Sequence, residues 1–138
     1  MGLFNRRLFT SLSEALANPT ACYRLHLQVA DDHLRAWGPR LLPLTRLQEL
    51  RLHGQPGLYD RPDFALPDEL GRLRTLREVE LLNLPLAFPD WVRSLSGLRV
   101  LTLRGTNVAA LPEWIAELHA LRTLRIENWP WLKVWYKS

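Results

Sequence analysis

The sequence predicts an α/β solenoid of about five repeats, with short parallel strands on a concave side and short helices or 3₁₀ turns on a convex side. An apolar pattern at offsets 0, 3 and 5 starts at residues 22, 47, 76, 98 and 121. A proline-led segment precedes each of the last three copies, at 66–70, 88–92 and 111–115. Consecutive copies start 25, 29, 22 and 23 residues apart. Repetition in one register is typical of stacked units.

The apolar pattern predicts the strands. Its copies are Cys22/Leu25/Leu27, Leu47/Leu50/Leu52, Leu76/Val79/Leu81, Leu98/Leu101/Leu103 and Leu121/Leu124/Ile126. The last two positions of each copy alternate with polar residues at period two, so they lie on one face of a strand. A strand this short cannot bury that face alone, but strands stacked ~4.8 Å apart share one continuous core.

The proline-led segments predict the convex side. Proline suits a first helical turn because its missing amide needs no partner there. The acidic residues that follow, Asp68, Asp90 and Glu113, complement the positive end of such a turn. Trp91 and Trp114 recur at equivalent positions, and we expect them to pack along the convex ridge.

With these patterns the chain resembles a leucine-rich-repeat protein over about residues 22–132, and the segment 11–27 resembles the amino-terminal caps of small stand-alone bacterial members. The family usually has asparagine three residues after the last strand leucine. Here Ala30, Gln55, Leu84, Thr106 and Trp129 occupy those positions. We therefore expect an irregular polar ladder, with a local backbone bond still available to Thr106.

We expect residues 1–138 to form one domain. Residues 1–21 form an amino-terminal cap, 22–128 the leucine-rich repeats, and 129–138 an aromatic carboxy-terminal cap. Ser11 or Ser13 would begin a short helix whose Leu12 and Leu16 cover the first repeat. Such caps are needed because the ends of a stack expose its core.

The composition favours a soluble globular protein, with 47% apolar and 23% charged residues. No apolar run reaches the ~20 residues that span a bilayer, and the amino terminus fits a signal peptide poorly. The single cysteine excludes a disulfide framework, so we expect a cytoplasmic protein. The net charge of +4 is spread along the chain and interleaved with acids, so no specific nucleic acid is expected as partner.

The residues between the strand leucines form a polar grid on the concave sheet, which the family resemblance implies is the commonest partner site. The predicted contact residues there are Arg24, His26, Arg51, His53, Glu78, Glu80, Leu82, Arg104, Arg125 and Glu127. Arginine anchors in a mixed-charge surface fit protein–protein contact. Leu82 is apolar in an outward position, so it either packs against its neighbours or contacts the partner.

Two further segments supply candidates outside the grid. The second repeat is about six residues longer than the others, within 54–65, and repeat insertions often carry binding. Its apolar residues Leu58, Tyr59 and Phe64 either meet a partner or lie beneath the loop. In the tail, Trp135 and Tyr136 are candidate contacts if the tail is more than a cap.

Arg77, Arg99 and Arg122 recur at one repeat position and should stack as a ladder, called here the arginine row. The row is either a solvated edge or a strip that receives acidic groups.

The sequence favours a binding protein that is not an enzyme and carries no metal or cofactor. Cys22 occupies a core position, where burial makes a thiol inert. No catalytic or phosphate-binding motif occurs. The expected partner is another protein, with monomer as the default oligomeric state. The resemblance suggests an immunity protein that neutralises a toxin, or an adaptor. A secreted effector that binds a host protein is the alternative, and nucleic-acid binding through the arginine row is the second.

Overall fold

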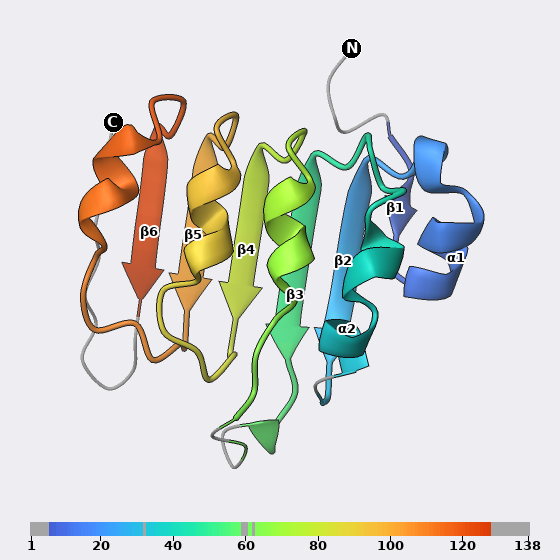
Figure 1. The fold of residues 1–138 in the computed structure, drawn as a ribbon. Coiled ribbons are helices and arrows are strands. Elements are labelled where there is room, and N and C mark those ends of the chain that lie inside the picture. Colours follow the sequence, from blue (N-terminus) through green and yellow to red (C-terminus); the bar gives the residue numbers. More distant parts are fainter. Residues whose placement is uncertain (1–5, 32, 59–60, 62, 128–138) are drawn as a thin grey trace.

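The computed structural model describes residues 6–31, 33–58, 61 and 63–127. Its strands form one open parallel sheet in sequence order, with the short helices on one face (Figure 1). The strands are β1 (Leu8–Phe9), β2 (Arg24–Val29), β3 (Glu49–Gly54), β4 (Glu78–Leu82), β5 (Val100–Arg104) and β6 (Thr123–Glu127). The fold is therefore the predicted α/β leucine-rich-repeat solenoid.

Helical elements cover the convex side, as expected. They are α1 (Leu12–Ala17), η2 (Pro19–Ala21), α2 (His33–Ala36), η3 (Gly38–Leu41), η5 (Asp68–Arg72), η6 (Asp90–Ser94) and η7 (Glu113–Glu117). Of these, α1 lies at the amino-terminal end of the sheet beside β1 (Figure 1). In the last three repeats the proline is the residue before the 3₁₀ helix rather than within its first turn. Each of these helices still begins with the acidic residue predicted for it.

The strand register is the one that the leucine pattern predicts. Leu25, Leu50, Val79, Leu101 and Leu124 lie at one level across the sheet, and Leu27, Leu52, Leu81, Leu103 and Ile126 at another. All of them except Leu27, which is partly buried, belong to the buried core that runs from Phe9 to Ile126. The core is therefore continuous along the stack, as a solenoid requires.

Backbone hydrogen bonds at the start of each strand fix the register between neighbouring repeats. The carbonyl of Tyr23 accepts from the amides of Gln48 and Glu49, at 2.8 and 3.0 Å. The Gln48 carbonyl binds the amides of Arg77 and Glu78 in the same way, and the pattern continues through β6. Each repeat thereby fixes the backbone of the next.

The amino-terminal cap differs from the prediction in one respect, because it contributes a sixth strand. β1 pairs with β2, and Phe9 lies beside Leu25 and is only 1% exposed. An aromatic side chain here covers the open end of the core, which a helix alone would leave partly exposed. The helix itself is as expected: Ser11 precedes α1, and its hydroxyl accepts a hydrogen bond from the Glu14 amide at 3.4 Å.

The convex ridge contains the two recurring tryptophans. Trp91 is buried, and Trp114 packs edge-on against Phe88 with ring centroids 5.5 Å apart. Both therefore belong to the packing of the repeats, as predicted.

The predicted irregularity of the polar ladder is visible where the strands end. Leu84 is buried, and Thr106 is buried with its hydroxyl accepting a 3.5 Å hydrogen bond from the Val108 amide. Asn83 adopts a positive φ of 57°. Its backbone N–H, not its side chain, donates to the Arg104 carbonyl at 2.8 Å. Backbone groups and the Thr106 hydroxyl thus supply some of the turn hydrogen bonds that asparagine side chains usually supply in the family.

The expected aromatic cap at 129–138 lies outside the described residues. Within the residues that are described, no helix has the length and apolar character needed to cross a bilayer.

Candidate functional site on the concave face

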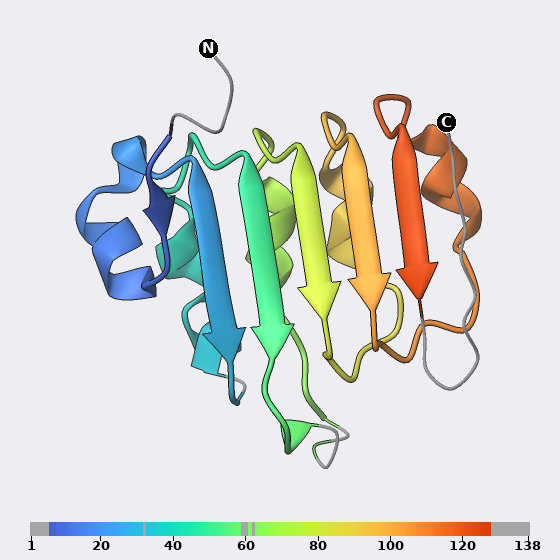
Figure 2. The same ribbon diagram turned by 180° about the vertical axis from the view of Figure 1, so that it is seen from behind.

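The concave face is the side of the sheet that the helices leave uncovered (Figure 2). Its side chains form three rows that follow the strand register. From β2 to β6, the first row is Arg24, Glu49, Glu78, Val100 and Thr123, the second is His26, Arg51, Glu80, Thr102 and Arg125, and the third is Gln28, His53, Leu82, Arg104 and Glu127. The structure therefore brings all ten predicted concave-face residues onto one surface.

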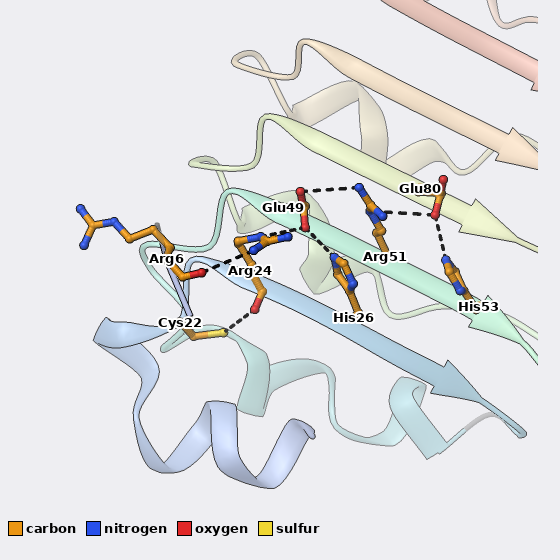
Figure 3. Close-up of polar contacts among 8 residues, drawn as sticks. All are labelled: Arg6, Cys22, Arg24, His26, Glu49, Arg51, His53 and Glu80. Atoms are coloured by element: carbon orange, nitrogen blue, oxygen red, sulfur yellow. Dashed lines mark hydrogen bonds and ion pairs between the residues drawn. The ribbon is translucent and has the colours of Figure 1, made fainter. Parts of the chain in front are cut away.

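Glu49 is the centre of a cluster of ionic contacts on β2 and β3 (Figure 3). Its Oε2 lies 3.2 Å from Arg24 Nε and accepts a hydrogen bond from His26 Nε2. Its Oε1 lies 3.8 Å from Arg51 Nη2. The residue is only 4% exposed, because these three side chains cover it. Glu49 directly precedes the strand leucine Leu50, so it belongs to the predicted polar grid, but it was not among the predicted contact residues.

Burial alone would raise the pKa of Glu49. The hydrogen bond from His26, the charges of Arg51 and Arg24 and the hydrogen bond from Arg24 outweigh that effect and hold the pKa below its ordinary value. The carboxylate is thus stabilised in its charged form, which keeps Arg24, His26 and Arg51 in place around it.

Arg51 links this cluster to the next strand. Its Nε lies 4.0 Å from Glu80 Oε2, and the same oxygen accepts a 2.8 Å hydrogen bond from His53 Nε2. Figure 3 shows the resulting chain of contacts along β2, β3 and β4. In both pairs a histidine contacts a glutamate on the following strand, one row nearer the strand start.

A second ionic cluster lies at the other end of the sheet. Glu127 Oε2 lies 2.9 Å from Arg104 Nε, and Glu127 Oε1 lies 3.5 Å from Arg125 Nε. Both arginine side chains remain accessible, at 41% and 37% exposure. Solvent screening makes such partly exposed pairs weak contributors to stability, so their main effect is to orient the guanidinium groups.

Between the two clusters the face is hollowed. A depression of ≈ 80 Å³ is lined by Glu78 and Glu80 on one side and by Val100 and Thr102 on the other. It forms because Val100 and Thr102 have short side chains, whereas Arg51 and Glu80 have long ones. Leu82 is half-buried and lies between His53 and Arg104 in the third row, so part of it is open to a partner.

The predicted loop contacts need a correction. Leu58 is completely buried and Phe64 is 7% exposed, so neither side chain presents a surface to a partner. Both join the core, because the loop after β3 folds its apolar residues beneath itself. Tyr59, Trp135 and Tyr136 lie outside the described residues.

The described side chains hold neither a metal-ligand cluster nor an exposed thiol. No group of three or more histidine, cysteine or acidic residues suited to a metal ion occurs among them. Cys22 is buried, and burial raises the pKa of its thiol to about 11 although the charge of Arg7 lowers it. A thiol in that environment is not a nucleophile at neutral pH.

No protein-family model matches the chain, and no curated protein sequence matches it. Among solved structures, it is similar to a leucine-rich-repeat protein of Leptospira interrogans, with 22% identity and a TM-score of 0.52. The match covers 88% of this chain and 36% of that one, so this chain spans little more than a third of its neighbour's length. At this identity the likeness concerns the fold. By its repeats, its sheet and this neighbour, the chain has a leucine-rich-repeat fold.

Proposed function

We propose that this protein binds another protein through its concave face and performs no chemistry on it. The observation that carries the proposal is the set of partly exposed arginines that ion pairs hold in place. Arg51, Arg104 and Arg125 are 40%, 41% and 37% exposed, and each contacts a glutamate on its own or a neighbouring strand.

Preorganised arginines favour recognition because less side-chain entropy is lost when a partner binds. Arginine is also among the residues that dominate the binding energy of protein interfaces. Leu82 adds a half-buried apolar surface to the same face, two residues along β4 from Glu80 in the wall of the hollow. The face therefore combines charged anchors with a small recess, the arrangement expected of a protein contact surface.

The charge of the face favours a protein over a nucleic acid. Its three rows contain the arginines Arg24, Arg51, Arg104 and Arg125, and as many glutamates: Glu49, Glu78, Glu80 and Glu127. A phosphate backbone requires a surface with an excess of positive charge. A face of alternating sign instead selects a partner whose charges alternate in the complementary order.

Within this proposal the specific role is that of an immunity protein that occludes a toxin, or of an adaptor. A repeat stack whose described residues hold no metal-ligand cluster fits both. The net charge of +4 favours a toxin that is acidic or acts on membranes, because a basic nuclease would be repelled. A secreted effector that binds a host protein would use the same face, so the identity of the partner distinguishes these roles.

A quantitative pulldown tests the proposal. Tagged wild-type protein and a variant with Arg51→Gln, Arg104→Gln and Arg125→Gln are used as baits in lysate of the native cell, and bound proteins are quantified by mass spectrometry. Glutamine avoids a new carboxylate beside Glu49, Glu80 and Glu127. A control variant, Arg35→Gln, Arg40→Gln and Arg61→Gln, removes the same charge from exposed positions outside the concave face.

We expect a stoichiometric partner that the control retains and the concave-face variant loses. A partner retained equally by all three baits would show that this face is not the binding site. A toxin as the partner would select the immunity role, and a host protein the effector role.

A further inference from the structure

The arginine row lies at the strand-start edge of the solenoid, outside the concave grid. Arg77, Arg99 and Arg122 each occupy the position just before β4, β5 and β6. Their backbones are bonded in sequence: the Arg99 amide donates to the Arg77 carbonyl, and the Arg122 amide to the Arg99 carbonyl, both at 2.8 Å. The three residues are therefore neighbours, one strand apart.

The guanidinium groups of the row differ from those of the concave face. All three residues are exposed, and no carboxylate in the described part of the chain lies within 4.0 Å of their side-chain nitrogens. Like charges at the spacing of adjacent strands repel one another. An anionic partner would relieve that repulsion, whereas the concave arginines are already neutralised by glutamates.

The fold concentrates positive charge on this edge. Each convex segment returns the chain to the start of the next strand, and its helix ends near that strand-start edge (Figure 1). The helix starts carry Asp68, Asp90 and Glu113, whereas Arg72 and Arg93 lie in the last turns of η5 and η6. The last turn of η7 instead holds Glu117, which pairs with Arg93 at 3.4 Å. The acids at the helix starts are thus set back from the arginine row, although Glu78 directly follows Arg77 in the chain.

We propose that the arginine row is a second binding surface, which receives a carboxylate-rich helix of a partner protein. Adjacent strands are ~4.8 Å apart, so Arg77 and Arg122 are separated by ~10 Å along the stack. Acidic residues at positions i, i+4 and i+7 of a helix recur about once per 5.4 Å turn. Three glutamates on one helix face therefore meet the three arginines one to one, in charge-assisted contacts.

The same geometry is less suited to nucleic acid. Phosphates of a duplex strand recur every ~3.4 Å along its axis, which does not match the strand spacing. The residues two positions before the arginines are Thr75, Gly97 and Ala120, which have no ring on which a base could stack. The row adjoins the first row of the concave grid but shares no residue with it, so its variants test this inference separately from the proposed function.

Fluorescence anisotropy tests the proposal with defined probes. One labelled helical peptide carries glutamates at i, i+4 and i+7, and a second of equal composition carries them on different helix faces. The third probe is a labelled oligothymidylate with the same number of negative charges. Each is titrated at ~50 mM salt with wild-type protein, with the row variant Arg77→Gln, Arg99→Gln and Arg122→Gln, and with the control variant Arg35→Gln, Arg40→Gln and Arg61→Gln.

We expect the one-face peptide to bind wild type at least tenfold more tightly than the row variant, and the control variant to bind within about twofold of wild type. The dispersed peptide should bind wild type more weakly than the one-face peptide. Equal losses in both variants, or no peptide binding, would overturn the proposal. Tighter binding of the oligothymidylate, lost in the row variant, would overturn it in favour of a nucleic-acid site.

Discussion

His26 on β2 donates a hydrogen bond to Glu49 on β3, across two neighbouring repeats. Glu49 is 4% exposed, and of the polar and charged residues in the described part of the chain only Thr106 is also buried. A buried carboxylate with basic partners on two strands ties the first repeats together through side chains as well as through the backbone. Removal of the Glu49 charge should therefore lower the free energy of unfolding.

Replacement of Glu49 by glutamine should lower the free energy of unfolding by about 1–3 kcal/mol at pH 7, because Arg24, His26 and Arg51 lose their shared charged partner. Urea denaturation followed by circular dichroism measures the loss. Glu78→Gln is the matched control: it lies beside Glu49 in the first row, has no ion pair in the described part of the chain, and should cost within about 0.5 kcal/mol. An equal loss in both variants would contradict the role assigned to Glu49.

The stability difference between wild type and Glu49→Gln should depend on pH. The pKa of Glu49 is lower in the folded chain than its ordinary value of 4.5, so the folded state binds fewer protons than the unfolded state near that pH. The stabilisation is complete above the ordinary pKa and disappears as the pH falls through the folded value. The stability difference between wild type and Glu49→Gln should therefore shrink below pH ~4.5. A difference that grows as the pH falls would reverse the assigned sign.

Two adjacent residues on β4 test which face of the sheet each side chain occupies. Leu81 is fully buried and Leu82 is half-buried on the concave face. Leu81→Ala should destabilise the fold by ~2–5 kcal/mol because it leaves a cavity in the core, whereas Leu82→Ala should cost about 1 kcal/mol or less. Thermal and urea denaturation of both variants provide the comparison. If Leu82→Ala proved the more damaging, the assignment of faces would be wrong.

The end of β3 requires glycine. A Cβ added at Gly54 would lie 2.0 Å from the Asn83 carbonyl oxygen, a backbone atom that cannot rotate away. Gly54→Ala should therefore destabilise the protein by more than about 1 kcal/mol. At Gly97 the nearest atom to an added Cβ is 3.7 Å away, so Gly97→Ala should be close to neutral. Similar melting temperatures for the two variants would rule out this close approach of repeats.

Cys22 should react with a disulfide reagent only when the chain unfolds. Burial raises the pKa of its thiol to about 11, so the thiolate is scarce at pH 8 in the folded protein. A rise of two pKa units alone reduces the thiolate fraction roughly 100-fold, and burial slows access further. Stopped-flow measurement with Ellman's reagent, in buffer and in concentrated guanidinium chloride, gives the two rates. Native and denatured rates within twofold of each other would show that the residue is accessible.

The sequence was sufficient to predict the solenoid because the same apolar pattern recurs in every repeat. A leucine at a fixed offset determines which face of a strand it occupies, and the repeat at Leu50, Val79 and Leu101 determines the register between strands. The missed strand, β1, has no such period: it consists of Leu8 and Phe9, and it forms because the core needs a cover at its first repeat.

The candidate site was predictable in its positions but not in its contacts. The grid followed from the alternation along each strand, so its residues were placed correctly. The burial of Glu49 depends on three long basic side chains from two strands, and a residue pattern does not specify their rotamers. The loop after β3 is not periodic either, so the burial of Leu58 and Phe64 could be weighed against exposure but not decided.

The most direct test of the proposed function is the affinity of the purified partner for three forms of the protein, measured by isothermal titration calorimetry. These are the wild type, the variant with Arg51→Gln, Arg104→Gln and Arg125→Gln, and the control with Arg35→Gln, Arg40→Gln and Arg61→Gln, each shown by circular dichroism to be folded. We predict at least a tenfold weaker Kd for the concave-face variant, with the control within about twofold of wild type. Unchanged affinity in the concave-face variant would contradict the central claim that this face binds the partner.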